Sequence, residues 1–524
     1  MTKGRADPRT RGDIDELSRQ LTRLLDSDPT EAIRQARKID LSSSDRLNAM
    51  SVRAAILVDA GAMTHKQEAV EEGLQLFRAL YGEVPKTSEA YNLANALASA
   101  VGTPPRGPDW LEHQENTREQ RAEARQLYWR VAHDEPAGRE LRTQAWTNVA
   151  NQFSNSYRLG EAHDARLAAL DVDPSNGVAA GSAARELIWI FNQGGCSDLT
   201  RVEAIMLAKV AERHQDRVRK YAGQRAADEL AALAAQLGDA RPRSPHPDPF
   251  VRWVERERLT LSPVVELVDP ALGKLDWLML PGILEREPGQ DPAIPPPLFA
   301  MFNVLKADFI LARDLVWRTI SEAGWPTTGR FADTLDYATY GPDASALVVA
   351  HRTALDILDK VAVTANHYFD LGQAANRVHF GRMWRESRGK KADPKPLTPA
   401  VANTIRAGVM ALYGLAELAD DYDSDSGILR SQKNLRNAGT HRFVVLHDIG
   451  DPGSARQTAE VERHQRDDFS DEVLKALRVA RSAIQMLTLS IAQRERLLAK
   501  DAEGMIGKIH VPDHDWVRGR DDNG

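Results

Sequence analysis

Cysteine is almost absent from this 524-residue sequence, in which Cys196 is the only one. A single thiol can form neither an intramolecular disulfide nor a multi-cysteine zinc site, and this usage fits a reducing compartment. Long apolar runs are missing too: none approaches the roughly 20 residues that a membrane-spanning helix needs, and the first thirty residues hold no secretory signal pattern. We therefore expect a cytoplasmic protein that neither crosses a membrane nor is secreted.

Positive charge is not in excess either, since 68 Lys and Arg residues face 75 Asp and Glu residues and the formal net charge is −7. The molecule as a whole therefore has no electrostatic attraction for nucleic acid, and any RNA contact has to come from a local basic patch. Apolar residues make up 42% of the sequence, which is enough to build the buried cores of two or three domains.

Alternating apolar and polar positions, which are typical of β-strands, are rare. Apolar residues instead recur at helical spacing along almost the whole chain, so the sequence predicts an all-α fold. Prolines interrupt this pattern between 239 and 298 and indicate a domain boundary. That connecting segment also carries Trp253, Leu259 and Leu261, which are too apolar to leave in water, so we expect it to pack on the second domain.

The first domain, 1–238, contains a repeated pattern. Its offsets resemble the tetratricopeptide repeat (TPR), whose units of about 34 residues combine a large residue in the first helix with small alanines in the second and end at a proline. An earlier copy begins at Asn92 and resumes at Ala124 after a proline-rich insertion, and weaker hairpins are expected at 45–80 and 180–236. The pattern predicts a TPR-like helical solenoid, most simply a binding surface, although a generic bundle with accidental spacing stays open. The fullest copy consists of Trp146, Asn148, Val149, Ala150, Phe153, Ala162, Ala169 and Pro174.

The second domain, 299–500, shows four strong helical stretches joined by polar segments, which is the pattern of a four-helix bundle. A polar tail, 501–524, follows it. The third stretch ends in an acidic turn, after which we expect the helical pattern to continue to about 447. The four stretches are 299–323, 343–372, 398–419 and 468–498.

The segment after the acidic turn reads Arg436-Asn437-Ala438-Gly439-Thr440-His441. On a helix Asn437 and His441 share one face, whereas Arg436 points about 140° away from His441. Histidine titrates near neutral pH and can act as acid or base, and arginine offers a planar fork that matches phosphate oxygens. Basic residues surround the motif and could bind backbone phosphates; a solvated helix face is the alternative for them. These basic residues are Arg430, Lys433 and Arg442.

An Arg-Asn-x-x-x-His motif before the last long helix of a four-helix bundle resembles the signature of the HEPN superfamily. Two further stretches are similar to a HEPN branch that is fused to TPR-like repeats. One is Leu358-Asp359-Lys360 with Tyr368-Phe369, and the other is Trp253 followed by Leu259-Thr260-Leu261-Ser262-Pro263. The likeness therefore extends over most of the chain.

The resemblance implies a homodimer, formed through the HEPN domain, in which two copies of the motif face each other and share one phosphate. It further implies a metal-independent endoribonuclease, with Arg436, Asn437 and His441 as catalytic residues and no cofactor. Asp359 and Lys360 are expected to support the motif, with Asp359 orienting His441, or else to form a surface charge pair. A toxin or anti-phage role, regulated by a protein or peptide ligand of the TPR-like half, is implied as well.

Other chemistries find little support. His510 and His514 have a spacing that zinc can use, but Pro512 between them disfavours a helix, so we expect no metal site. No phosphate-binding glycine loop and no dinucleotide fingerprint occur. One alternative of a different class stays open: a non-catalytic TPR/HEPN adaptor that serves protein interaction or nucleotide binding.

Overall fold

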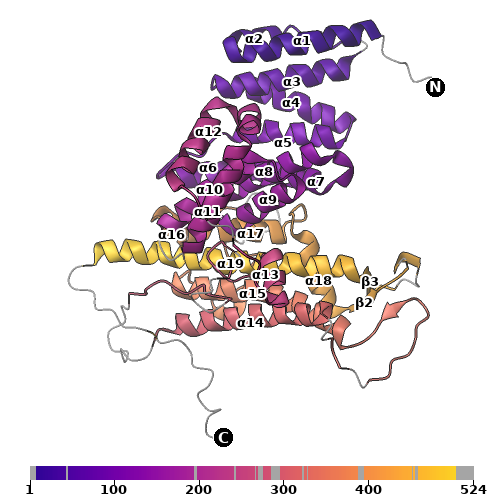
Figure 1. Ribbon diagram of the computed structural model, residues 1–524, viewed down its shortest axis with the longest axis vertical. Helices are drawn as coiled ribbons and strands as arrows, with labels where there is room; N and C mark the ends of the chain where they lie inside the picture. The colour runs from indigo at the N-terminus through magenta and orange to yellow at the C-terminus, as the bar shows by residue number, and fades with distance from the viewer. Residues whose placement is uncertain are drawn as a thin grey trace, which may run out of the picture.

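A computed structural model confirms the all-α class: in the part of the chain that it describes, 19 α-helices are accompanied by only three short strands (Figure 1). In that part, every helix is too short or too polar to cross a bilayer. The residues described are 8–42, 45–193, 198–240, 243–265, 267–268, 275–284, 295–321, 324–326, 329–386, 395–450, 452–454, 458–502 and 511.

The first twelve helices form an array of stacked hairpins. The closely packed pairs are α3 with α4, α5 with α7, α8 with α9 and α10 with α11, and α6 is the insertion that the sequence placed inside the second of these pairs. Small residues allow the close packing, since a Cβ on Gly73 would lie 2.8 Å from the carbonyl oxygen of Ala54. The assignment of these hairpins to the TPR family stays a prediction. Their bounds are α1 Pro8–Ser27, α2 Pro29–Ala36, α3 Arg46–Met63, α4 Gln67–Glu83, α5 Thr87–Val101, α6 Asp109–Asn116, α7 Arg118–His133, α8 Arg139–Asn155, α9 Leu159–Val172, α10 Gly177–Asn192, α11 Asp198–Arg213 and α12 Gln215–Leu237.

The remaining helices surround the longest one, α19. It packs against α14, α15 and α17, and on its other side it contacts α9 of the hairpin array. In Figure 1 it runs across most of the width of the molecule, between the array and α14. Fully buried side chains from all four helices form one core, among them Phe309, Leu355, Leu415 and Ile484. The bounds are α13 Pro249–Arg256, α14 Pro297–Ile320, α15 Pro342–Tyr368, α16 Pro399–Arg406, α17 Ala411–Asp423, α18 Arg430–His441 and α19 Arg466–Asp501.

The connecting segment touches both halves. Leu259 and Leu261 belong to the core around α19. Val264 and Val265, however, belong to the core of α10, α11 and α12. The apolar residues between the prolines therefore join the two cores.

The four helical stretches predicted for 299–500 are present, with one difference. The third is divided into α16 and α17, because Gly408 adopts a φ of +110° just after α16 and ends that helix. The fourth and the first agree with α19 and α14 to within a few residues. Of the predicted polar tail, all but Asp501, Ala502 and Val511 lie outside the described residues.

The prediction that the helix after the acidic turn continues to about 447 is wrong. The helix α18 ends at His441, Arg442 is extended with φ −135° and ψ 177°, and β2 (Phe443–His447) follows. The run Phe443–Leu446 contains two valines and favours a strand. It pairs in parallel with β3 (Val461–Gln465) and antiparallel with β1 (Ala338–Thr339). The strand β1 lies far earlier in the chain, and β3 begins 14 residues after β2 ends, so the local pattern alone did not reveal the sheet.

Candidate active site

The motif occupies the second half of α18, and this helix is fastened to α15 and α19. Gln432 is buried, and its Oε1 lies 2.9 Å from Nε2 of His351 on α15. Its amide nitrogen donates to the carbonyl oxygen of Glu472 on α19 at 3.2 Å. Gly439 lies inside α18 and faces α15, since a Cβ there would meet Val348 at 3.4 Å. The helix therefore has one side held by the core and one side left to solvent.

Arg436 lies at the border between these two sides and is braced by two carboxylates of α15. Its Nε and Nη2 donate to one oxygen of Asp356 at 3.0 and 2.7 Å, and Nη2 also donates to Asp359 at 2.7 Å. Burial of the guanidinium lowers the pKa of Arg436, but Tyr422 and Asp359 outweigh that effect and raise the pKa above its ordinary value. The arginine is therefore a fixed cation, half-buried and held in place.

Asn437 and His441 lie on the exposed side of α18. They are four residues apart and share one face of the helix, as the sequence predicted. Arg436 is turned toward α15 instead. A single chain therefore brings Asn437 and His441 together and keeps the guanidinium of Arg436 on a different side of the helix.

Residues 290–494 match the model of a protein family described as LA2681-like HEPN. We refer to residues 290–494 as the HEPN-like region because of this similarity. The match covers less than half of the chain, begins seven residues before α14 and ends within α19, and includes the whole of α15 and α18. No curated protein matches the chain.

The two residues of the HEPN-like region expected to support the motif have different roles. Asp359 binds Arg436 through one carboxylate oxygen and accepts the backbone N–H of Phe380 at 2.8 Å with the other, so it positions Arg436 and not His441. Lys360 forms an ion pair with Asp308 of α14 and does not reach the motif. The interpretation of Asp359 and Lys360 as a surface pair is therefore also incorrect.

Sequence reasoning missed Asp356, the second carboxylate of the brace. Asp356 and Asp359 are three residues apart on α15, a spacing that puts both on one helix face. Two carboxylates on one face of a helix can bind a single arginine, so this spacing was the signal in the sequence that could have identified Asp356. His351 was missed as well, because a single histidine in an apolar helix gives no hint of a partner 81 residues away.

The three basic residues that the sequence predicted around the motif, Arg430, Lys433 and Arg442, are all paired within the chain. Arg430 forms an ion pair with Asp425 and donates to the carbonyl oxygen of Asp423, and Lys433 forms an ion pair with the carboxylate of Asp423. Arg442 pairs with Glu462 of β3 at 2.6 Å. A phosphate would therefore have to compete with these carboxylates.

Arg352 differs from these cations. It lies on α15 with its Cγ and Cδ against Gly439 of the motif, where a Cβ would meet them at 3.4 Å. Among the residues that the structure describes, no carboxylate forms an ion pair with it. Arg352 is therefore a cation beside the motif that a phosphate could bind without displacing a carboxylate of the described residues.

No group of three or more His, Cys, Asp or Glu side chains in the described ranges is arranged to hold a metal ion. The histidines considered for zinc, His510 and His514, lie outside the described residues. The side chains of the motif itself offer an imidazole, an amide and a guanidinium group.

Proposed function

We propose that the HEPN-like region is a metal-independent endoribonuclease in which Arg436, Asn437 and His441 are the catalytic residues. The observation that supports this most is their arrangement on α18: Asn437 and His441 share an exposed face, while two carboxylates brace Arg436 on the adjoining side. An imidazole can transfer protons near neutral pH, and a fixed guanidinium can stabilise negative charge without reorganising.

In the proposed reaction, His441 removes the proton from a ribose 2′-hydroxyl, and the oxygen attacks the adjacent phosphorus. The bond between phosphorus and the 5′-oxygen breaks, and a second imidazole returns a proton to that oxygen. Arg436 stabilises the charge on the pentacoordinate phosphorus. The products are a 2′,3′-cyclic phosphate and a 5′-hydroxyl, and DNA is inert because it lacks the attacking group.

A second copy of the chain would supply the second imidazole. Half-exposed apolar side chains on α14 and α15, Val304, Leu311 and Val349, suit such a contact. On α15, Val349 lies on the same stripe as Asp356 and Lys360 because these residues are spaced by seven and four, and Lys360 joins α15 to α14 through its ion pair with Asp308. This α14–α15 face is continuous with the brace of Arg436, and we assign homodimerisation to it.

RNA backbone binding would use Arg352 together with Arg430, Lys433 and Arg442, the last three exchanging a carboxylate partner for a phosphate. The role of a toxin or anti-phage effector rests on the resemblance to HEPN proteins. The hairpin array, 1–238, would then bind the protein or peptide that regulates it, and 239–298 would link the array to the nuclease domain.

The decisive experiment incubates the purified full chain with end-labelled RNA and a chelator and identifies the cut ends. We expect cyclic phosphate and 5′-hydroxyl ends, with cleavage reduced at least about 100-fold in Arg436→Ala and His441→Ala, which is typical of the loss of a catalytic group. The exposed His379 provides the matched control, His379→Ala, which should cleave like the parent protein.

A requirement for magnesium, or 5′-phosphate ends, would contradict the mechanism. Absence of any cleavage would favour the alternative, a non-catalytic adaptor. The biological role has a separate test: expression should inhibit growth, and the two active-site variants should lose that toxicity while the control variant keeps it.

A further inference from the structure

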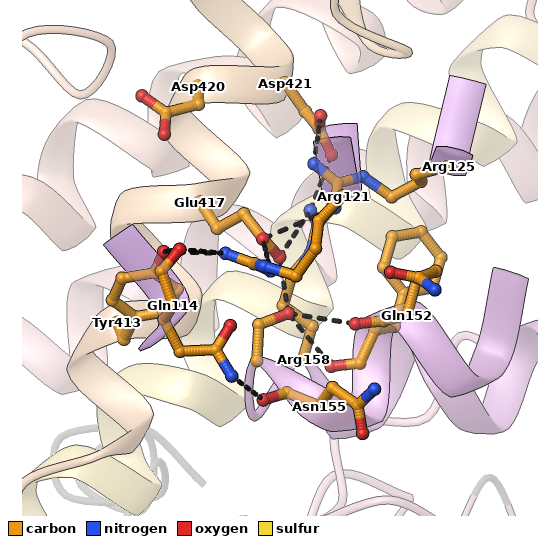
Figure 2. A network of polar contacts seen from close by, with 12 residues as sticks. Gln114, Arg121, Arg125, Gln152, Asn155, Arg158, Tyr413, Glu417, Asp420 and Asp421 are labelled. Carbon is orange, nitrogen blue, oxygen red and sulfur yellow. Dashed lines mark hydrogen bonds and ion pairs between the residues drawn. The ribbon is translucent and has the colours of Figure 1, made fainter. Parts of the chain in front are cut away.

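A fully buried network of charges joins the hairpin array to α17, the helix before the motif helix. Arg121 and Arg125 of α7 and Arg158 at the start of α9 reach across to Glu417 and Asp421 of α17. All five side chains are almost completely shielded from solvent. Figure 2 shows the three guanidinium groups converging on the two carboxylates.

Each of the two carboxylates of α17 has several partners in the array. Glu417 binds Arg121, accepts from the hydroxyl of Ser156, and lies 3.4 Å from Arg125. Burial alone would raise the pKa of Glu417, but the surrounding arginines outweigh burial and hold this pKa well below its ordinary value. Glu417 is therefore ionised.

Asp421, one turn later, has two partners in the array. It accepts from Arg125 at 2.8 Å with one oxygen and from Arg158 at 2.5 Å with the other. Arg158 also binds Glu161 of its own helix at 2.6 and 2.7 Å. Asp421 is thus the point where the array holds the last turn of α17 from two sides.

The last turn of α17 in turn holds the start of the motif helix. The carbonyl oxygen of Asp421 accepts the N–H of Leu429 at 3.1 Å. The chain between them turns so tightly that a Cβ on Gly427 would lie 2.0 Å from that same oxygen. The next residue, Tyr422, lies beside the guanidinium of Arg436 and contributes to its raised pKa. Asp423 then binds Arg430 and Lys433 of α18.

A second bridge runs parallel to this one. Arg385 of the HEPN-like region binds Asp420 of α17 at 2.6 Å and Glu115 of α6 at 2.9 Å. The close approach of the two halves is also visible at Gly414 of α17, where a Cβ would lie 3.0 Å from the carbonyl oxygen of Ser156. The turn between α8 and α9 therefore has no room to shift without moving α17.

Buried ion pairs are a poor source of stability, because apolar residues of the same shape often stabilise a protein as well or better, but they demand one geometry of the charged groups. Here the buried ion pairs join α7 and α9 of the array to α17, the helix that leads into the motif helix. Such a two-sided contact is the kind of element through which binding at one site biases another.

We propose that Arg125 and Arg158 are positioning residues for Arg436: by holding Asp421 they set where Tyr422 and α18 lie, so that the hairpin array controls the motif. This inference deepens the proposed nuclease function and rests on it for its catalytic consequence. A ligand that changes the curvature of the array would act on α18 by shifting α7 and α9 against α17.

The test compares two isosteric variants of the full chain, Asp421→Asn and Glu161→Gln. Each removes one carboxylate partner of Arg158 inside the same buried network, but only the first alters α17. Hydrogen exchange followed by mass spectrometry is measured at temperatures equally far below each variant's unfolding midpoint. We expect Asp421→Asn to speed exchange in 424–441 at least tenfold relative to the parent protein, and Glu161→Gln to leave that segment unchanged.

The catalytic consequence is measured on the same proteins. Asp421→Asn should lower kcat at least tenfold and by a larger factor than it raises KM, because Arg436 is misplaced while Arg352 on α15 still binds the RNA backbone, whereas Glu161→Gln should keep kcat within threefold of the parent. If Asp421→Asn does not fold, Arg125→Lys replaces it, with Arg121→Lys as control, since Arg121 contacts Glu417 but not Asp421.

If hydrogen exchange in 424–441 rises equally in the test variant and in its control, Arg125 and Arg158 do not position Arg436. The two proposals fail separately: selective exchange in 424–441 without any RNA cleavage by the parent protein keeps the coupling and removes the nuclease. Cleavage with uniform exchange keeps the nuclease and removes the coupling.

Discussion

His351 of α15 and Gln432 of α18 form a buried hydrogen bond, with 2.9 Å between Nε2 and Oε1. Burial lowers the pKa of His351 below its ordinary value of 6.5, against the smaller raising effects of Gln432 and Glu472, while His464 and Arg436 lower it further. The bond lies one helical turn before Arg436 and ties the motif helix to the core. Because His351 can be protonated, the hydrogen bond that attaches α18 to α15 is sensitive to pH.

The first prediction concerns that pH dependence. Because the folded pKa of His351 is depressed, the unfolded chain binds more protons below about pH 6.5, and the free energy of unfolding falls as the pH falls through this range. His351→Asn keeps an N–H donor but does not titrate. Urea unfolding at pH 7.5 and 5.5 should show a smaller loss for His351→Asn than for the parent protein; equal losses would contradict the assignment.

The second prediction separates the two carboxylates that brace Arg436. Asp359→Ala leaves the N–H of Phe380 without its acceptor and should cost about 1–3 kcal/mol, whereas Asp356→Ala removes only a half-exposed ion pair, worth about 0–1 kcal/mol. Both should reduce RNA cleavage, since each loosens Arg436. Thermal unfolding and kcat measure the two effects, and a larger stability loss in Asp356→Ala would be inconsistent with the contacts.

The third prediction concerns Arg352 as a phosphate ligand. Arg352→Ala should weaken binding of single-stranded RNA and reduce the slope of log K against log salt by about 0.7, the value for one phosphate contact. Arg225→Ala is the control, because Arg225 is an exposed cation on α12 of the hairpin array, away from the motif, and pairs with Glu229. Fluorescence anisotropy at several salt concentrations tests this; an unchanged slope in Arg352→Ala would remove it from the RNA site.

The fourth prediction concerns the proposed dimer face. Leu311→Asp places a charge among the exposed apolar residues of α14 and should shift the protein from dimer to monomer in sedimentation velocity, with loss of RNA cleavage. Met63→Asp changes an equally exposed residue of α3 in the hairpin array and should leave both properties intact. A dimer that survives Leu311→Asp would place the interface elsewhere.

The fifth prediction tests the tight contact between the two halves. In Gly414→Ala the new Cβ would meet Met486 at 2.7 Å and the backbone of Ser156 at 3.0 Å, so the substitution should destabilise by about 1–3 kcal/mol. Gly82→Ala in α4 meets no atom within 4 Å and should stabilise by about 0.4–1 kcal/mol. Denaturant unfolding measures the change in the free energy of unfolding for both variants. A change of the same sign in the two variants would contradict the prediction.

Much of the helical architecture was predictable from local patterns. The spacing of Trp146, Ala162 and Pro174 indicated the hairpin that became α8 and α9, and the proline-rich insertion was recognised inside an interrupted hairpin. The 140° divergence of Arg436 and His441 followed from helix geometry alone. Periodicity is a local property, and these features needed nothing else.

The sheet and the brace were not predictable in the same way. Phe443–His447 becomes a strand because β1 and β3 are beside it, and Asp356 matters because α15 packs against α18. Both β1 and Asp356 are far in sequence from the residues that they contact.

The sequence by itself determined that this chain is helical and that an imidazole, an amide and a guanidinium share one helix. Only the tertiary structure decided which carboxylates hold Arg436 and where α18 stops. It also decided that three arginines of the hairpin array reach the helix before the motif. The reason is that side-chain spacing along a helix is set by backbone geometry, whereas the partners of a buried charge are chosen by packing between segments hundreds of residues apart.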